Sequence, residues 1–182
     1  MAKITKHISL SFANSDELTE FYRLLQVNYP KFFKMDDLSK LGILASEMIF
    51  KDADNRFEPR EDIAVICFNR SSSLDVDMQF QETINNDNFY PSPSLFVYTL
   101  PNIVAGEIAI RNKFYGETSF YVCKDFDAKQ IFRTVQNAFY DKTTNAVLVA
   151  WIEHLEVFMA LVENETGDVK FSEKNLKNII FL

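Results

Sequence analysis

The sequence predicts an α/β domain in which helices cover both faces of a layered, mixed β-sheet. Apolar runs of strand length alternate with amphipathic segments of helix length along nearly the whole chain, and residues 63–68, IAVICF, are apolar without a break. A strand of that composition is typical of a sheet that is covered on both faces. At 182 residues, the chain suits a single domain spanning positions 1–182, with room for a sizeable core.

The first elements are a strand and two helices. Residues 4–12 alternate enough to predict a strand, and Asn14 or Ser15 then indicates the start of a helix. Asp36 or Asp37 caps the second helix, because apolar residues follow at spacings of three and four. These apolar residues are Leu38, Leu41, Leu44, Ala45, Met48 and Ile49.

A polar turn and a proline-rich segment flank the third predicted helix. The turn at residues 69–73 follows the covered strand, and its serines suit turn and capping positions better than catalysis. The helix then ends near residues 85–87. Pro91 and Pro93 hold the backbone extended, so residues 95–100 predict a short strand or extended segment.

The next segment combines an apolar helix, a strand and a capped helix. Residues 102–113 predict the apolar helix, and its interior glycine, Gly106, is expected to pack closely against another element. Residues 118–123 are rich in strand formers. Asp125 is then expected to cap an amphipathic helix, with Asp127 in its first turn. Two further strands and a turn precede a terminal segment of undecided type: residues 144–151, 157–162 and 164–168.

Charge and hydropathy exclude two classes of partner. The net charge is −7, the pI is about 4.9, and the basic residues are scattered, which argues against binding nucleic acid. The longest apolar run, residues 146–152, is far shorter than the roughly 20 residues of a membrane span, and the N-terminus lacks a signal-peptide pattern. We therefore expect a cytoplasmic protein without a membrane partner.

The two cysteines do not predict a metal or redox site. Cys67 and Cys123 lie in apolar, strand-like runs and lack the short paired spacing of such sites. Both are expected to be inert thiols, and the sequence indicates no metal and no cofactor.

Four segments resemble the N-terminal half of the β-ketoacyl synthases, which are the 3-oxoacyl-acyl carrier protein synthases of the thiolase-like superfamily. The segment TLPNIVAGEIAIRNKFYGETSFYV is similar to the buried helix of these enzymes, its glycine-containing exit and the strand that leads to their active-site cysteine. KMDDLSKLGILASEMIF resembles their early Met-Asp helix, and AVICFNRSSSLDVDMQFQETI their next strand, loop and helix. NAVLVAWIEHL resembles a strand ending in a Gly-Gly-x-Glu turn, with Glu153 at the Glu position. The resemblance implies a thiolase-like half fold over about residues 1–160.

The chain departs from this family at the residues that carry its chemistry. Counted from Gly116 without gaps, Asp125 stands at the position of the family's cysteine, and Lys124 and Phe126 replace its small neighbours. Ala150-Trp151 stands where the family has paired glycines. The family uses a thiolate at a helix N-terminus to take up an acyl chain as a thioester, and a carboxylate cannot form that thioester.

The histidines of the family are also missing from the sequence. The resemblance implies a second half with two histidines for decarboxylation, whereas this chain contains His7 and His154 alone, and neither matches those motifs. The catalytic residues are therefore expected to be absent.

For several individual residues, a catalytic or metal-binding role is less favoured than a purely structural role. Cys123 is a possible displaced nucleophile served by His154, but a strand-end cysteine is more often structural. Asp125 with Asp127 is a possible acid/base pair or metal site, but two carboxylates at a helix start usually cap it. His154 beside Glu153 is a possible base, but a strand-end surface histidine is the simpler interpretation.

Three aromatic residues near the proline-rich segment are candidates for an acyl channel. Tyr90, Phe96 and Tyr98 have a suitable spacing, but aromatic residues in such a pattern more often belong to the core.

The resemblance implies a non-catalytic ketosynthase-like subunit. Such a subunit, similar to a chain length factor, would pair with itself or with an active ketosynthase in fatty-acid or polyketide biosynthesis, for example of an aryl-polyene-type pigment, with an acyl carrier protein as a possible further partner. By resemblance, the partner interface is the strand that contains Thr118, Phe120 and Val122. The alternatives are a stand-alone acyl-thioester transferase or hydrolase that uses Cys123, and an acyl-ligand-binding module.

Overall fold

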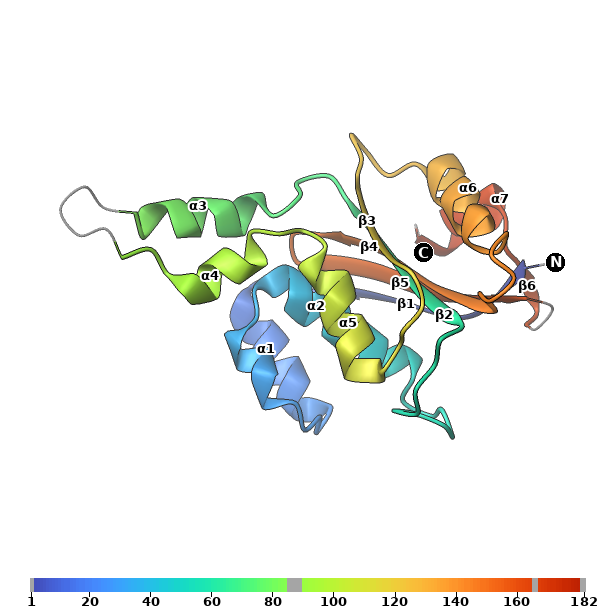
Figure 1. The fold of residues 1–182 in the computed structure, drawn as a ribbon, viewed down its shortest axis with the longest axis horizontal. Helices are drawn as coiled ribbons and strands as arrows, with labels where there is room; N and C mark the ends of the chain where they lie inside the picture. The colour runs from blue at the N-terminus through green and yellow to red at the C-terminus, as the bar shows by residue number, and fades with distance from the viewer. Residues whose placement is uncertain (1, 85–89, 165–166, 181–182) are drawn as a thin grey trace.

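A six-stranded mixed sheet forms the centre of the molecule (Figure 1). The computed structural model describes residues 2–84, 90–164 and 167–180. The strand order is β3-β2-β4-β5-β1-β6. The strands are β1 (Ala2–Ser11), β2 (Ile63–Asn69), β3 (Thr118–Val122), β4 (Ala146–Glu153), β5 (Glu156–Asn164) and β6 (Val169–Lys170). The prediction of a mixed sheet is confirmed, because β2 runs parallel to β3 and β4 while β5 is antiparallel to β4 and β1.

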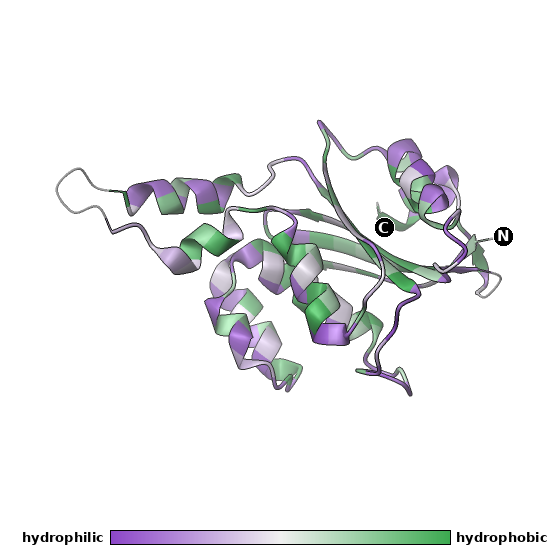
Figure 2. Cartoon of the chain, viewed as in Figure 1, coloured by the Kyte–Doolittle hydropathy of each residue, from purple (hydrophilic) through white to green (hydrophobic). Residues whose placement is uncertain are grey.

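Helices cover both faces of this sheet, as the sequence predicts (Figure 1). The helices are α1 (Ser15–Leu24), η1 (Pro30–Lys34), α2 (Asp37–Ile49), α3 (Leu74–Glu82), α4 (Pro93–Tyr98), α5 (Ile103–Asn112), α6 (Ala128–Ala138) and α7 (Glu173–Ile180). Helices α1, α2 and α5 share one apolar cluster with the sheet, and α6 and α7 share a second cluster on the opposite face. All seven residues of β2 are buried, as its apolar run predicts. Hydrophobic residues follow the strands, whereas hydrophilic residues are frequent on α6 and α7 (Figure 2).

The predicted caps of the first two α-helices are present. The Asn14 side chain accepts hydrogen bonds from the backbone N–H groups of Asp16 and Glu17, and the Asp36 side chain accepts from that of Ser39. These bonds satisfy donors that a helix start otherwise leaves without partners. The helix boundaries therefore follow from local side-chain chemistry.

Helices α2 and α5 approach each other at a glycine, but not at the glycine that we expected. A Cβ atom added to Gly42 of α2 would lie 2.6 Å from Val104 Cγ2 and 3.0 Å from Ile108 Cδ1, both on α5. A Cβ atom added to Gly106 would meet no atom within 4 Å. The expected close packing of Gly106 is therefore wrong, and Gly42 is the residue that permits the contact between these helices.

The segment after the two prolines is helical rather than extended. Pro93 occupies the first turn of α4, where a missing N–H costs nothing, and the Ser92 side chain accepts a hydrogen bond from Leu95 N. The prediction of a strand or extended segment at residues 95–100 is therefore wrong, because a capped N-terminal proline starts a helix as readily as it prevents one. Helices α3 and α4 pack together and extend away from the rest of the fold (Figure 1).

Helix α3 is shorter than predicted, and the end of the chain has regular secondary structure. The helix expected to end near residues 85–87 ends at Glu82, and residues 85–87 lie outside the described residues. The terminal segment of undecided type forms β6, which pairs with β1, and α7, which packs beside α6. Within the described parts of the chain, no helix is both long enough and apolar enough to cross a membrane.

Candidate functional site

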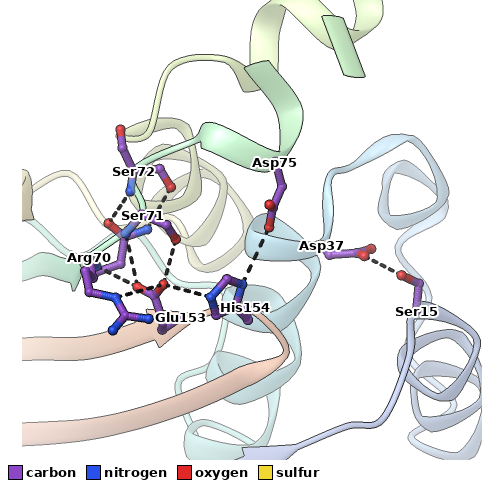
Figure 3. A network of polar contacts seen from close by, with 9 residues as sticks. Ser15, Asp37, Arg70, Ser71, Ser72, Asp75, Glu153 and His154 are labelled. Atoms are coloured by element: carbon purple, nitrogen blue, oxygen red, sulfur yellow. Dashed lines mark hydrogen bonds and ion pairs between the residues drawn. The ribbon is translucent and has the colours of Figure 1, made fainter. Parts of the chain in front are cut away.

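Polar residues meet where the parallel strands β2 and β4 end. Strand β2 ends at Asn69 and leads into the turn at residues 70–73, and its neighbour β4 ends at Glu153 (Figure 3). Glu153 Oε2 accepts hydrogen bonds from the backbone N–H groups of Arg70 at 2.6 Å and Ser71 at 3.2 Å. Glu153 Oε1 accepts one from Ser71 Oγ at 2.7 Å. In α/β sheets, ligand sites commonly lie at this carboxyl edge, so this network is a candidate functional site.

These hydrogen bonds keep Glu153 ionised. Burial acts to raise the pKa of the Glu153 carboxyl group, but the bonds from the Ser71 hydroxyl and the two backbone N–H groups outweigh it and hold the pKa below its ordinary value. The group is therefore a carboxylate at neutral pH and a weak base. Its role in this geometry is to join the end of β4 to the turn after β2.

Asn69 holds the same turn from the other side. Its side-chain Nδ2 donates to the Ser72 carbonyl at 2.8 Å, and its Oδ1 accepts from Ser72 N at 2.9 Å. Asn69 is fully buried, and Ser72 has a φ of 55°, in the left-handed region. The paired bonds to Asn69 hold this conformation, which a serine seldom adopts.

His154 lies next to this network without completing a catalytic arrangement. Its Nε2 is 3.3 Å from Glu153 Oε1, and its Nδ1 is 3.8 Å from Asp75 Oδ2 (Figure 3). A serine nucleophile needs a base that accepts its hydroxyl proton. The Ser71 hydroxyl instead donates to Glu153, and the His154 side chain is 59% exposed. The prediction of a surface histidine at a strand end is confirmed.

A pocket of about 180 Å³ opens beside this network, on the face covered by α2. Its polar lining comes from η1 and the first turn of α2, from the serine turn, from α3 and α4, and from the turn between β4 and β5: Lys34, Asp36, Asp37, Lys40, Ser71, Ser72, Ser73, Asp75, Gln79, Ser94 and His154. Lys40 Nζ donates to Asp37 Oδ1 at 2.9 Å, and Ser15 also donates to the Asp37 carboxylate (Figure 3). The Asp37 carboxylate and the Lys40 ammonium group of the lining thus neutralise each other.

Two titratable groups of the pocket lining, the buried Tyr98 and the partly buried Asp36, have raised pKa values. Burial, followed by the charges of Glu107 and Asp36, raises the pKa of Tyr98 to about 12, so its phenol stays neutral. Burial likewise raises the pKa of Asp36 above its ordinary value. Tyr98 is a core residue, as the sequence suggests, but Tyr90 is 83% and Phe96 55% exposed, so the core assignment is wrong for these two.

The position predicted for the nucleophile does not lie at the start of a helix. Asp125 is exposed in the connection between β3 and α6, and Asp127 is the N-cap of α6. Asp127 Oδ1 accepts from Lys129 N at 2.8 Å and from Gln130 N at 3.2 Å. The expectation that Asp125 caps this helix is therefore wrong. Phe126 directly precedes this cap, and its ring lies edge to face with that of Trp151, with the ring centres 5.4 Å apart.

The structure does not bring Cys123 and His154 together. Cys123 packs against the cluster on the α6 side of the sheet, whereas His154 lines the pocket on the α2 side. Burial, followed by the charge of Asp127, raises the pKa of the Cys123 thiol, which favours the protonated, unreactive form. Cys67 is fully buried, with a pKa of about 12. In the described parts of the chain, no three His, Cys, Asp or Glu side chains form a group that could hold a metal ion.

The strand predicted to form a partner interface lies at an edge of the sheet. Strand β3 pairs with β2 and has no strand on its other side among the described residues. Thr118 and Val122 are exposed, and Phe120 is partly buried against the α2/α5 cluster. Both the edge position and the absence of charge on residues 118–122 agree with a surface that a partner can cover.

Sequence reasoning missed the Glu153 and Asn69 networks. A usable signal existed, because polar residues directly follow two apolar runs of strand length. The pairing of Glu153 with the serine turn nevertheless depends on the parallel register of β2 and β4, which matches Phe68 with Trp151. Local patterns do not specify that register.

Solved structures similar to this chain are ketosynthases and chain length factors. No protein-family model and no curated protein matches the sequence. The ishigamide ketosynthase/chain length factor superposes with a TM-score of 0.71 at 17% identity, over 90% of this chain and 62% of the other. A ketosynthase in complex with its chain length factor from Xenorhabdus doucetiae gives 0.66 at 14% identity, over 91% and 80%.

A third similar structure contains a ketosynthase of a type II polyketide synthase with its acyl-carrier protein. It gives a TM-score of 0.63 at 12% identity, over 90% of this chain and 62% of the other. The chain thus spans between about three fifths and four fifths of the length of these three structures. Such likeness at low identity establishes the architecture. The chain therefore has the thiolase-like fold shared by ketosynthases and chain length factors.

Proposed function

We propose that this chain is a non-catalytic, chain-length-factor-like subunit that pairs through β3 with a ketosynthase or with a second copy of itself. The pair would help to assemble an acyl chain delivered by an acyl carrier protein, in fatty-acid or polyketide biosynthesis such as that of an aryl-polyene-type pigment. The observation that carries the proposal is an open, uncharged edge strand on a ketosynthase-like fold.

The chemistry around Asp125 supports a non-catalytic role. Acyl transfer by condensing enzymes requires a thiolate, and a helix N-terminus favours that ionised form. Here the first turn of α6 is capped by Asp127, Asp125 lies exposed before it, and the Cys123 thiol has a raised pKa. None of these three side chains combines the nucleophilicity and placement that the reaction needs.

The edge of β3 supports pairing. An exposed strand edge presents unpaired N–H and C=O groups that invite another strand, and proteins usually protect such edges with charge, bulges or a covering element. Residues 118–122 carry no charged side chain, and Val122 is 54% exposed. A partner strand would satisfy the backbone groups and cover Val122.

Native mass spectrometry with a matched pair of variants tests this proposal. The wild-type chain is co-expressed with a ketosynthase from its native host, and compared with Val122→Lys on β3 and Val169→Lys on β6, the opposite edge of the sheet. We expect the wild type and Val169→Lys to form a dimer, with the ketosynthase or with a second copy, and Val122→Lys to lose affinity by about tenfold or more, corresponding to about 1.4 kcal/mol. A wild-type chain that stays monomeric, or equal dimer formation by both variants, would contradict pairing through β3.

A second measurement tests the non-catalytic part separately. The chain is incubated with acyl-thioesters and its mass is measured after digestion. We expect no acyl adduct. An adduct on Cys123 would instead support the acyl-transferase or hydrolase hypothesis.

A further inference from the structure

Helices α3 and α4 form an arm whose two helices are joined to each other by hydrogen bonds. Directly before α3, Ser73 Oγ donates to the Thr99 carbonyl at 2.6 Å. Directly after α3, Thr83 Oγ1 accepts a hydrogen bond from Ser92 N at 3.0 Å. Because these bonds lie at both ends of α3, the two helices support each other more than either is supported by the rest of the fold.

Helix α3 is held to the body of the molecule by little buried surface. Val76 is the one buried residue of this helix, all of which the structure describes, whereas Leu74 and Met78 are 53% and 61% exposed. A segment with few buried apolar contacts opens locally at a low free energy. A single additional contact between α3 and the body therefore changes how often this helix opens.

His154 lies between a carboxylate of the body and a carboxylate of this arm (Figure 3). Its Nε2 is 3.3 Å from Glu153 Oε1, and its Nδ1 is 3.8 Å from Oδ2 of Asp75, in the first turn of α3. An imidazolium ion donates from both ring nitrogens, whereas a neutral imidazole donates from one alone. The protonated side chain can thus bind both carboxylates at once, and the neutral side chain cannot.

Charged groups lie around His154 on each element near it. They belong to the β4–β5 hairpin, the turn after β2, the first turn of α3 and, across the pocket of about 180 Å³, η1 and the first turn of α2: Glu153, Glu156, Arg70, Asp75, Asp77, Lys34, Asp36, Asp37 and Lys40. Lys40 pairs with Asp37, and Arg70 Nε lies 3.9 Å from Glu153 Oε1. Among the described residues, Asp75 has no ion pair other than that with His154. His154 is therefore the cationic partner that Asp75 gains when the pH falls.

We propose that His154 is a pH-operated latch between the β4–β5 hairpin and the α3–α4 arm. Histidine ordinarily gains its proton near pH 6.5, while aspartate stays ionised down to about pH 4. Below pH 6.5, the imidazolium ion bridges Glu153 and Asp75 and holds the first turn of α3 against the hairpin. As the pH rises through this range, the proton passes to solvent, the bridge is lost and α3 opens more often. Glu153 keeps its charge throughout, because its hydrogen bonds hold its pKa below the ordinary value.

The latch also lies at the mouth of the pocket beside the Glu153 network. His154 and Asp75 both line this pocket, one from the hairpin and the other from the arm, and their side chains are 59% and 68% exposed. Protonation of His154 draws the two side chains together and so narrows the mouth of the pocket. The latch does not depend on pairing through β3, so either proposal can fail alone.

Hydrogen exchange of the full chain at pH 5.5 and pH 7.5, followed by mass spectrometry, tests the latch. Protection factors are compared, because they correct for the effect of pH on the intrinsic exchange rate. An exposed ion pair shifts an equilibrium by up to about fivefold, so the amides of α3 should be about two- to fivefold better protected at pH 5.5. The amides of α6, on the opposite face of the sheet, should show no such difference.

The two histidines of the chain provide a matched control. His154→Asn removes the latch but keeps the turn, since residue 154 has a φ of 50° and asparagine tolerates a positive φ. It should abolish the difference between the two pH values, as should Asp75→Asn on the other side of the latch. His7→Gln replaces the exposed histidine on β1 and should keep the difference.

Four results would overturn the proposal. The first is equal protection of α3 at the two pH values in the wild type, and the second is a difference that α6 shares. The third is a difference that survives His154→Asn or Asp75→Asn, and the fourth is a difference that disappears in His7→Gln.

Discussion

Replacing Glu153 with glutamine tests whether an ionised carboxylate joins β4 to the turn after β2. The carboxylate accepts three hydrogen bonds, from Arg70 N, Ser71 N and Ser71 Oγ. A glutamine side chain offers one acceptor oxygen and places an NH2 group where the second oxygen was, so at least one donor loses its partner. Hydrogen bonds to charged groups contribute about 1.5–3 kcal/mol and neutral ones about 0.5–1.5 kcal/mol. We expect Glu153→Gln to lower the free energy of unfolding at pH 7 by about 2 kcal/mol. The loss stays moderate because Arg70 is exposed, so water can replace part of its lost hydrogen bond.

The loss should depend on pH with a defined sign. The folded-state pKa of Glu153 lies below its ordinary value, so the carboxylate stabilises the fold fully above the unfolded-state pKa, and this stabilisation is lost as the pH falls through the folded pKa. The difference between wild type and Glu153→Gln should therefore be constant between pH 7 and about 5 and should shrink below the ordinary glutamate range, near 4.5. Urea unfolding followed by circular dichroism across this range measures both quantities.

Glu156→Gln provides the matched control. Glu156 is exposed on the same hairpin and begins β5, so its replacement should change the free energy of unfolding by less than about 0.5 kcal/mol at every pH. Two results would refute the reasoning about Glu153. One is a loss at pH 7 no larger than that of the control, and the other is a large loss that stays the same down to pH 3.

Three further predictions use matched positions. Gly42→Ala should destabilise the fold by about 1–3 kcal/mol through overpacking against α5, whereas Gly106→Ala should stabilise it by up to about 1 kcal/mol, as urea unfolding will show. Asp127→Ala should lower the free energy of unfolding by about 0.5–2 kcal/mol through the loss of a helix cap, while Asp125→Ala should leave it nearly unchanged. Equal losses for the two variants in thermal unfolding would contradict the assignment of Asp127 as the cap. Cys123 should react with iodoacetamide more slowly at pH 7 than a free cysteine and faster as the pH rises, measured by mass spectrometry, because its pKa is raised; rapid reaction at pH 7 would contradict this.

The order and type of most elements could be predicted because they depend on local chemistry. The run at residues 63–68 is apolar at every position, and the structure buries each of those residues. Asn14 and Asp36 bind the backbone N–H groups that follow them, so the starts of α1 and α2 are encoded within three residues of sequence. The sequence was sufficient for the prediction where the residues that determine an element lie in the same short segment as the element itself.

The predictions from sequence were wrong or incomplete where two local signals compete, or where contacts between distant parts of the chain determine the structure. Both Asp125 and Asp127 are capable caps, and the structure uses Asp127, while Phe126 between them contacts Trp151, distant in sequence. Gly106 lies in an apolar helix, but the face of that helix that meets α2 contains Val104 and Ile108 instead. Which residues pack closely therefore depends on the side of the helix on which they lie, and not on the apolar composition of the helix alone. The Glu153 network depends likewise on the register of two strands about 80 residues apart.

The distribution of polar residues on the two helical layers bears on where a partner would dock. The outward residues of α6 are polar: Lys129, Gln130, Arg133, Gln136 and Asn137. A surface of this kind contributes little apolar area to an interface. On the other side, beyond the carboxyl end of β2, apolar side chains are exposed on β3, α3 and α4: Val122, Leu74, Met78, Phe96 and Val97. Because α3 and α4 extend from the body and β3 has an open edge, a partner that pairs with β3 could cover these side chains in the same interface. The exposed apolar residues and the open strand edge thus favour the same side of the molecule, and a lysine at position 122 should disturb both contributions at once.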